Sequence, residues 1–205
     1  MKKVLALFLL LTILSIAACS NDTGNNVDGE SSKQPMESTT ISDSVESFEA
    51  INQDEKEVSL NDFDVQWWVA NFVFTNCTTI CPPMTRNMKI LQDGLEEAEL
   101  DDVQLVSFSV DPERDTTEVL KEYGENHGAN FDTWNFLTGY DFDTVKNISE
   151  TSFQSCLLPP GDGDDQVMHT VSFFLINPDG EVVDRFDGTK QDEMDLLVER
   201  VNELK

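Results

Sequence analysis

Two cysteines separated by three residues are the strongest chemical signal in this 205-residue sequence. Cys77 and Cys81 follow an apolar run and precede a helical pattern that begins at Pro82. Both thiols therefore fall in a strand-to-helix turn, where unpaired backbone N–H groups and the helix dipole favour the thiolate over the thiol. The thiolate is the nucleophile of redox chemistry and a ligand for soft metals, so this turn is the first candidate site.

A histidine in a later apolar run could complete a site with the two thiols. His169 follows Cys81 by 88 positions. Two thiolates and one imidazole form a ligand set that suits copper, and the same residues could form a redox centre. A structural disulfide would close only a short loop, and structural zinc usually takes a second cysteine pair, which this sequence lacks. We therefore interpret the residues as a metal or redox site, and both alternatives stay open at this point.

Asp111 and His127 are two further polar residues near predicted element ends. Asp111 ends a second predicted central strand, so its side chain should lie near the same sheet edge as the thiols. It could orient His169 or hold a loop, but an aspartate before Pro112 also forms turns, and both interpretations stay open. His127 precedes Gly128 at a predicted helix end, where a side chain that hydrogen-bonds the last carbonyls is favoured, so we interpret it as a cap or a surface residue.

Cys156 is the odd thiol among the three cysteines of the predicted domain. Its neighbours Leu157 and Leu158 are apolar, so we expect Cys156 to be a small buried hydrophobic side chain. The alternative is a third thiolate that swings towards the site, because the polar loop after Cys156 leads into His169. A third thiolate would favour Cu(I) and permit a mixed disulfide.

Hydrophobic periodicity predicts strands and helices in alternation, followed by a hairpin and a last helix. This order predicts an α/β protein with a mixed central sheet and helices on both faces, and a cysteine pair after the first main strand is typical of a thioredoxin-like fold. The site should lie at the carboxyl end of that strand. The predicted strands cover 48–51, 58–60, 67–75, 103–110, 134–137, 167–176 and 181–186, and the helices cover 82–100, 116–127, 141–153 and 191–204.

The first 18 residues have the pattern of a secretory signal peptide. Lys2 and Lys3 precede an apolar run from position 4 to 16, which is short for a membrane-spanning helix. Ile-Ala-Ala then leads directly into Cys19, which resembles the bacterial lipobox. We therefore predict a signal peptide at 1–18 and a lipid on Cys19, which would hold the protein on the extracytoplasmic face of the cell membrane.

Residues 19–47 are polar and contain almost no large apolar side chain, so we predict a disordered tether before a folded domain at 48–205. The net charge of the chain is −27, and removing residues 1–18 takes away two lysines and no acid, which changes it to −29. Such a surface repels nucleic acid and anionic headgroups. Membrane attachment should therefore depend on lipid and not on charge, and nucleic acid is not an expected partner.

Four motifs together resemble the Sco family of copper proteins that assist assembly of cytochrome c oxidase, with the lipoprotein members of Gram-positive bacteria the most similar. The resemblance implies a thioredoxin-like fold, copper ligation by Cys77, Cys81 and His169, and a supporting role for Asp111. The motifs are Phe72-Val-Phe-Thr-Asn-Cys77-Thr-Thr-Ile-Cys81-Pro-Pro-Met-Thr85, Ser107-Phe-Ser-Val-Asp111-Pro-Glu113, Phe136-Leu-Thr-Gly139 and Gln166-Val-Met-His169.

Three functions fit these residues. The first is a monomeric copper metallochaperone that hands copper to the binuclear copper site of cytochrome c oxidase subunit II. The second is an extracytoplasmic thiol–disulfide oxidoreductase that uses Cys77 and Cys81 to reduce the cysteines of that subunit. The third is a thiol peroxidase, because Thr78-x-x-Cys81 resembles part of a peroxiredoxin motif, although that motif would place proline where this chain has Phe74.

Overall fold

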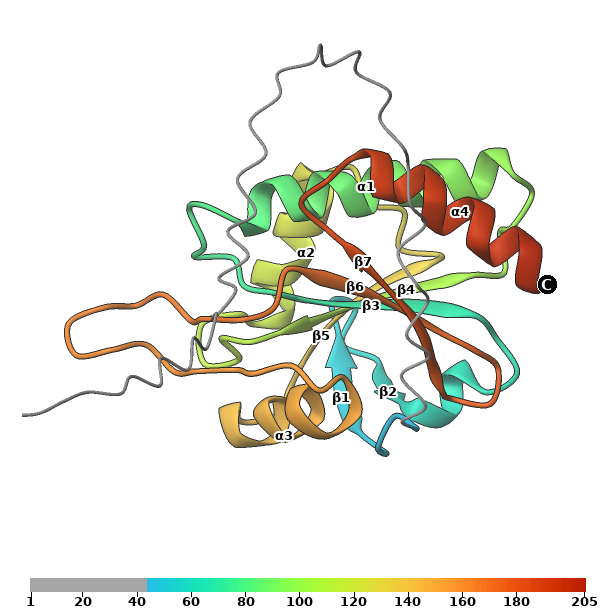
Figure 1. The fold of residues 1–205 in the computed structure, drawn as a ribbon. Coiled ribbons are helices and arrows are strands. Elements are labelled where there is room, and N and C mark those ends of the chain that lie inside the picture. Colours follow the sequence, from blue (N-terminus) through green and yellow to red (C-terminus); the bar gives the residue numbers. More distant parts are fainter. Residues whose placement is uncertain (1–43) are drawn as a thin grey trace, which may run out of the picture. The chain divides into compact units, whose positions relative to one another are not determined.

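The structure is a computed structural model that describes residues 44–205 (Figure 1). The predicted signal peptide, Cys19 and nearly all of the predicted tether lie outside the described residues. Ser44 pairs with Glu181 in an isolated bridge, and the side chain of Val45 is buried. Contacts with the domain therefore begin slightly before its predicted start.

One mixed sheet contains all seven strands of residues 44–205, in the order β2-β1-β5-β4-β3-β6-β7. The β3–β4 and β4–β5 pairs are parallel, and the β1–β2, β1–β5, β3–β6 and β6–β7 pairs are antiparallel. The strands are β1 (Glu49–Asn52), β2 (Glu57–Ser59), β3 (Trp68–Val73), β4 (Gln104–Ser109), β5 (Trp134–Thr138), β6 (Ser172–Ile176) and β7 (Val182–Asp187).

The central position of β3 in the sheet explains why its sequence is apolar throughout. All six of its residues are buried, because β4 and β6 flank it and helices cover the sheet. Phe72 of β3 lies opposite Phe108 of β4, and their rings stack with centroids 5.7 Å apart. The buried, two-sided strand that the apolar run predicted is therefore confirmed. The same parallel pairing brings the carboxyl ends of β3 and β4 to one edge of the sheet.

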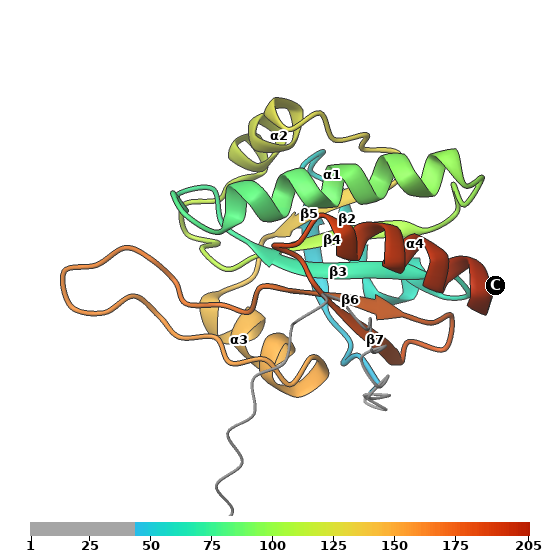
Figure 2. The ribbon, with the colours of Figure 1, turned by 45° about the horizontal axis from the view of Figure 1, so that its top comes forward.

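Helices cover both faces of the sheet, as predicted. Helices α1, α2 and α4 lie on one face and α3 lies on the other (Figures 1 and 2). Two helices have side-chain N-caps. Thr116 accepts from the Val119 N–H at the start of α2, and Asp141 accepts from the Thr144 N–H at the start of α3. None of the helices within residues 44–205 is long and apolar enough to cross a membrane. They are α1 (Cys81–Glu97), α2 (Thr117–Asn126), α3 (Phe142–Ser152) and α4 (Asp192–Leu204), with a short 3-10 helix η1 at Leu60–Phe63.

The predicted strand 167–176 is too long, because β6 begins only at Ser172. Its pairing with β7 starts there, opposite Asp187, and the preceding residues leave the sheet. Residues 154–171, which we call the His169 loop, extend away from the domain between α3 and β6 (orange in Figure 1). An isolated antiparallel bridge between Leu158 and Met168 joins the two arms of this loop. His169 therefore lies in a loop and not in a strand.

Candidate metal and redox centre

The two motif cysteines lie in the turn between β3 and α1, at the carboxyl edge of the sheet. Cys81 is the first residue of α1, and the backbone N–H of Cys81 donates to the sulfur of Cys77 at 3.3 Å. The N-cap residue Ile80 makes no side-chain cap bond, so the Cys77 sulfur accepts an N–H that the helix itself leaves unpaired. Both cysteines are free thiols. The predicted position of the pair at a helix N-terminus is confirmed.

The environments of the two thiols drive their pKa values in opposite directions. Burial disfavours the Cys77 thiolate, but N–H groups that follow it, led by that of Cys81, donate to its sulfur and lower the pKa of this thiol overall. Burial raises the pKa of Cys81 far above its ordinary value, and the Cys77 sulfur and the Asp115 carboxylate add to that effect. The prediction that the helix N-terminus favours both thiolates is therefore wrong for Cys81. Its side chain is 1% exposed and lies against the core, while Cys77 receives the helix N–H bonds.

His169, which is distant in sequence, reaches the turn between β3 and α1 that holds the two cysteines, which we call the cysteine turn. Its Nε2 atom lies 3.4 Å from the Cys81 sulfur, and its Nδ1 atom lies 2.7 Å from the carbonyl oxygen of Thr170. A carbonyl only accepts hydrogen bonds, so Nδ1 carries the proton and the Nε2 lone pair faces the thiol. Burial lowers the pKa of His169, which favours the neutral ring. The ring of Phe74 meets the imidazole edge-on at a centroid distance of 5.8 Å.

The described residues bring these groups together without closing them into a metal site. Within residues 44–205, no three His, Cys, Asp or Glu side chains stand close enough together to hold a metal ion as placed. The contacts that do form link Cys77 to Cys81 and Cys81 to His169. The donor chemistry nevertheless suits a soft metal, because two thiol sulfurs and a neutral imidazole nitrogen lie in one neighbourhood.

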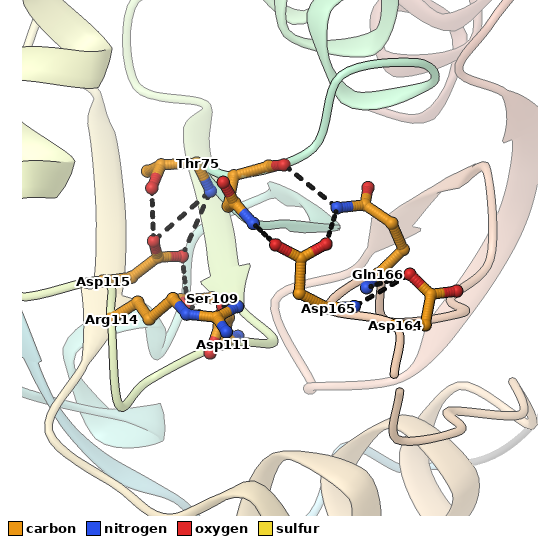
Figure 3. Close-up of polar contacts among 9 residues, drawn as sticks. Thr75, Ser109, Asp111, Arg114, Asp115, Asp164, Asp165 and Gln166 are labelled. Atoms are coloured by element: carbon orange, nitrogen blue, oxygen red, sulfur yellow. Dashed lines mark hydrogen bonds and ion pairs between the residues drawn. The ribbon is translucent and has the colours of Figure 1, made fainter. Parts of the chain in front are cut away.

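Asp111 lies at the carboxyl end of β4, where the sequence placed it, but its contacts are those of a turn. Its carboxylate accepts from the guanidinium of Arg114 at 3.0 Å, and its backbone N–H donates to the hydroxyl of Ser109 (Figure 3). Within residues 44–205, neither His169 nor a cysteine hydrogen-bonds to the Asp111 carboxylate.

Asp115 is the carboxylate that the sequence reasoning missed. It is fully buried and lies below the cysteine turn, where it accepts from the hydroxyls of Thr75 and Ser109 at 2.5 and 2.6 Å (Figure 3). The backbone N–H of Thr75 also points at both carboxylate oxygens, at 3.3 Å. Burial raises the pKa of Asp115, and these hydrogen bonds oppose the rise. In the sequence Asp115 looks like any acidic residue shortly before a helix. Only the structure shows that it is buried next to the cysteine turn, where it hydrogen-bonds to Thr75.

His127 is confirmed as a helix cap, since its Nδ1 atom donates to the Tyr123 carbonyl at 2.8 Å at the end of α2. The expectation that Cys156 is buried is wrong, because the structure exposes it. Burial alternates along the extended segment after α3, so that Leu157 faces the core and the residues on either side of it face solvent. An extended chain turns successive side chains to opposite sides, and an expectation based on apolar neighbours did not include this alternation.

A family model described as SCO1/SenC matches residues 36–204. This chain belongs to the SCO1/SenC family. A SCO1 protein homolog of Bacillus subtilis (strain 168) is 39% identical over 201 residues, which cover 98% of this chain and 96% of that protein. The likeness therefore extends over nearly the whole sequence.

Solved Sco structures share the fold. A SCO1/SenC family lipoprotein from Bacillus anthracis str. Ames is 38% identical with a TM-score of 0.76, over 81% of this chain and 97% of that one. BsSco, described as a member of the Sco family of cytochrome c oxidase assembly proteins with a disulfide switch, is 41% identical with a TM-score of 0.70, over 82% and 98%. ScoI of Arabidopsis thaliana, solved with copper bound, is 26% identical with a TM-score of 0.66, over 80% and 99%. The predicted thioredoxin-like α/β fold is confirmed.

Proposed function

We propose that this SCO1/SenC protein binds copper through Cys77, Cys81 and His169 and delivers it to the binuclear copper site of cytochrome c oxidase subunit II. The observation that carries the proposal is the 3.4 Å approach of His169 Nε2 to the Cys81 sulfur, across 88 residues of sequence. The copper-bound relative from Arabidopsis thaliana and the oxidase-assembly role named for BsSco support the same reading.

The chemistry of the three side chains favours copper as the cargo. Thiolate sulfur and imidazole nitrogen are ligands that copper prefers, and the depressed pKa of His169 keeps its ring neutral and able to coordinate. The Thr170 carbonyl, which accepts from Nδ1, fixes the tautomer that turns Nε2 towards the thiols. Copper has to displace the proton of Cys81, whose pKa is raised, so affinity should increase with pH.

A second candidate function, thiol–disulfide exchange with the cysteines of subunit II, follows from the unequal thiols. The Cys77 thiolate would attack a partner disulfide, form a mixed disulfide and release one partner thiolate. Cys81 would then pass its proton to His169 and attack the Cys77 sulfur, which releases the second partner thiolate and forms the Cys77–Cys81 disulfide. Two electrons would pass to the partner. The lowered pKa of Cys77 beside the raised pKa of Cys81 is the observation that favours this order of attack.

The site of action that we propose is the extracytoplasmic face of the cell membrane, with the protein acting as a lipid-anchored monomer. Ile16-Ala-Ala-Cys19 supplies the proposed attachment point, and the Bacillus anthracis relative is described as a lipoprotein. The net charge of −27 disfavours attachment through anionic headgroups, which leaves the lipid on Cys19 as the proposed anchor.

Copper titration of the reduced and the disulfide forms of the full chain tests the proposal. The reduced form should bind one copper with thiolate-to-copper charge-transfer absorption, and the disulfide form should bind none at the same concentration. Equal affinity of the two forms would overturn copper ligation by the cysteine pair. Transfer is then followed with the metal-free copper domain of subunit II, and failure of copper to move to it would overturn the delivery step. A Cys81→Ser variant that traps a mixed disulfide between Cys77 and subunit II would support the exchange function.

A further inference from the structure

The His169 loop touches the cysteine turn at a second place besides His169 itself. The side-chain amide of Asn76 donates to the Asp165 carboxylate at 2.7 Å, and the amide of Gln166 donates to the Asn76 carbonyl at 3.3 Å (Figure 3). Gln166 also donates to the other oxygen of Asp165 at 2.8 Å. We call these three residues the Asn76 contact. It joins the residue immediately before Cys77 to the segment that leads into His169.

The loop is folded so that it presents these groups. The Asp164 carboxylate accepts from the backbone N–H groups of Asp165 and Gln166, at 2.8 and 3.1 Å. Gly163, with φ of +80°, supplies the left-handed backbone conformation that the turn requires. This local turn holds the side chains of Asp165 and Gln166 together, on the side where both meet Asn76. The hydrogen bonds from Gln166 and Asn76 lower the pKa of Asp165, so it meets them as a carboxylate.

We propose that Asn76 is a positioning residue for copper binding, and that the Asn76 contact holds the His169 loop closed so that the imidazole stays beside the Cys81 thiol. The inference rests on the proposed copper function and adds to it a residue that does not touch the metal. Within residues 44–205, Asn76 is the one residue outside the loop that hydrogen-bonds to residues 159–168. Val167 in the same segment is buried, so part of this segment also packs against the domain.

The physical effect is preorganisation. His169 lies on a long loop, and bringing a loop residue to a metal requires the loop to be ordered, which weakens binding if it happens only when copper arrives. Two residues separate Gln166 from His169, and none separates Asn76 from Cys77, so the contact restrains both ligands at short range. The bond from Asn76 to Asp165 involves an ionised acceptor, which makes it stronger than a neutral hydrogen bond.

The experiment compares copper affinity and the charge-transfer spectrum of the full-length wild type, Asn76→Ala, Asp165→Asn and the control Asp162→Asn. The control removes one negative charge from the same loop, and Asp162 makes no hydrogen bond or ion pair within the described residues. Asn76→Ala should weaken copper binding about tenfold, the equivalent of losing one hydrogen bond to a charged group, because alanine removes the donor to Asp165 but keeps the backbone carbonyl that accepts from Gln166. Asp165→Asn should show a smaller loss and the control none. An equal loss for Asp165→Asn and Asp162→Asn would assign the effect to charge alone and overturn the proposal.

A double-mutant cycle decides whether Asn76 acts through His169. In a His169→Ala background, Asn76→Ala should have no further effect on copper affinity, because the ligand that it positions is gone. An undiminished tenfold loss in that background would show that Asn76 acts on the cysteine turn instead, and would overturn the assignment.

The metal-free protein supplies a readout that does not depend on copper. In the wild type the Phe74 ring lies against the imidazole, so the NMR signals of the His169 ring should move towards random-coil positions in Asn76→Ala and stay in place in Asp162→Asn. Unmoved signals in Asn76→Ala would refute the positioning role even if the wild type binds copper. A wild type that fails to bind copper would refute the proposed function alone, and these signals would still test the contact.

Discussion

Replacement of Asp115 is the sharpest test of how the site is supported. This carboxylate is 0% exposed and accepts from the Thr75 hydroxyl, the Thr75 N–H and the Ser109 hydroxyl. Asp115→Ala leaves the hydroxyl hydrogen of fully buried Ser109 without its acceptor, at a cost of ~1–3 kcal/mol. The lost bonds to half-buried Thr75 add ~1–2 kcal/mol, and removal of a buried charge offsets part of the total. We expect a net loss of ~2–4 kcal/mol in the free energy of unfolding.

Asp115→Asn separates the charge from the hydrogen bonds. The amide oxygen still accepts from one donor, so the loss at neutral pH should be ~1 kcal/mol, below that of the alanine variant. The raised pKa of Asp115 means that the native protein keeps this proton at pH values where the unfolded chain has lost it. The stability that Asp115 contributes is therefore greatest below its ordinary value of 3.8 and is lost as the pH rises through the folded pKa.

Urea unfolding of the reduced wild type and both variants, from acid to neutral pH, measures these differences. The advantage of the wild type over Asp115→Asn should shrink as the pH rises, because only the wild type carries a titrating group at this position. Loss of the Asp115 charge should also speed alkylation of Cys81 at pH 8, since that charge opposes the Cys81 thiolate. The reasoning is refuted if Asp115→Ala unfolds at the wild-type urea midpoint, or if the wild-type advantage over Asp115→Asn grows with pH.

The remaining predictions concern the histidine and the cysteines. His169→Ala should weaken copper binding of the reduced protein by more than about 100-fold, because loss of a direct ligand should exceed the roughly 10–100-fold effects of residues behind a ligand. Thermal unfolding of this variant should stay cooperative, and an unchanged dissociation constant would contradict the three-ligand set. Iodoacetamide at pH 7 should modify exposed Cys156 and then Cys77 well before Cys81, as followed by peptide mass spectrometry, and a fast-reacting Cys81 would contradict its raised pKa. Cys156→Ser should leave copper affinity and the single Cys77–Cys81 disulfide unchanged, and a mixed disulfide to Cys156 after mild oxidation would argue against this. Cys19→Ala should release the protein from the membrane fraction or leave it as unprocessed precursor, whereas an unmodified Cys19 in wild-type membranes would rule out the lipid anchor.

The architecture could be predicted because its signals are local. The continuous apolar run of β3 needs burial on both faces, and the spacing of Met84, Met88 and Leu91 in α1 needs one buried stripe. These patterns depend on residues a few positions apart, so the order of strands and helices came out correctly.

The start of β6 could not be predicted, because pairing decides it. Residues 167–171 are as compatible with a strand as those that follow, yet the partner strand β7 meets the chain only from Ser172. The prediction that Cys156 is buried was wrong for a related reason. Its apolar neighbours indicate a buried segment, but the extended backbone directs alternate side chains to opposite sides, and nothing in the residue types specifies which side faces the core.

The sequence by itself determined the chemistry of this protein: two thiols at the start of a helix, one distant imidazole, and an order of elements that brings functional residues to the carboxyl edge of a sheet. Only the tertiary structure decided how those groups differ. Which thiol ionises depends on whether its sulfur meets helix N–H groups, as Cys77 does, or a desolvated pocket near a buried carboxylate, as Cys81 does. The carboxylate beneath the turn is Asp115 and not Asp111, because burial and hydrogen bonding depend on contacts between strands that are far apart in sequence.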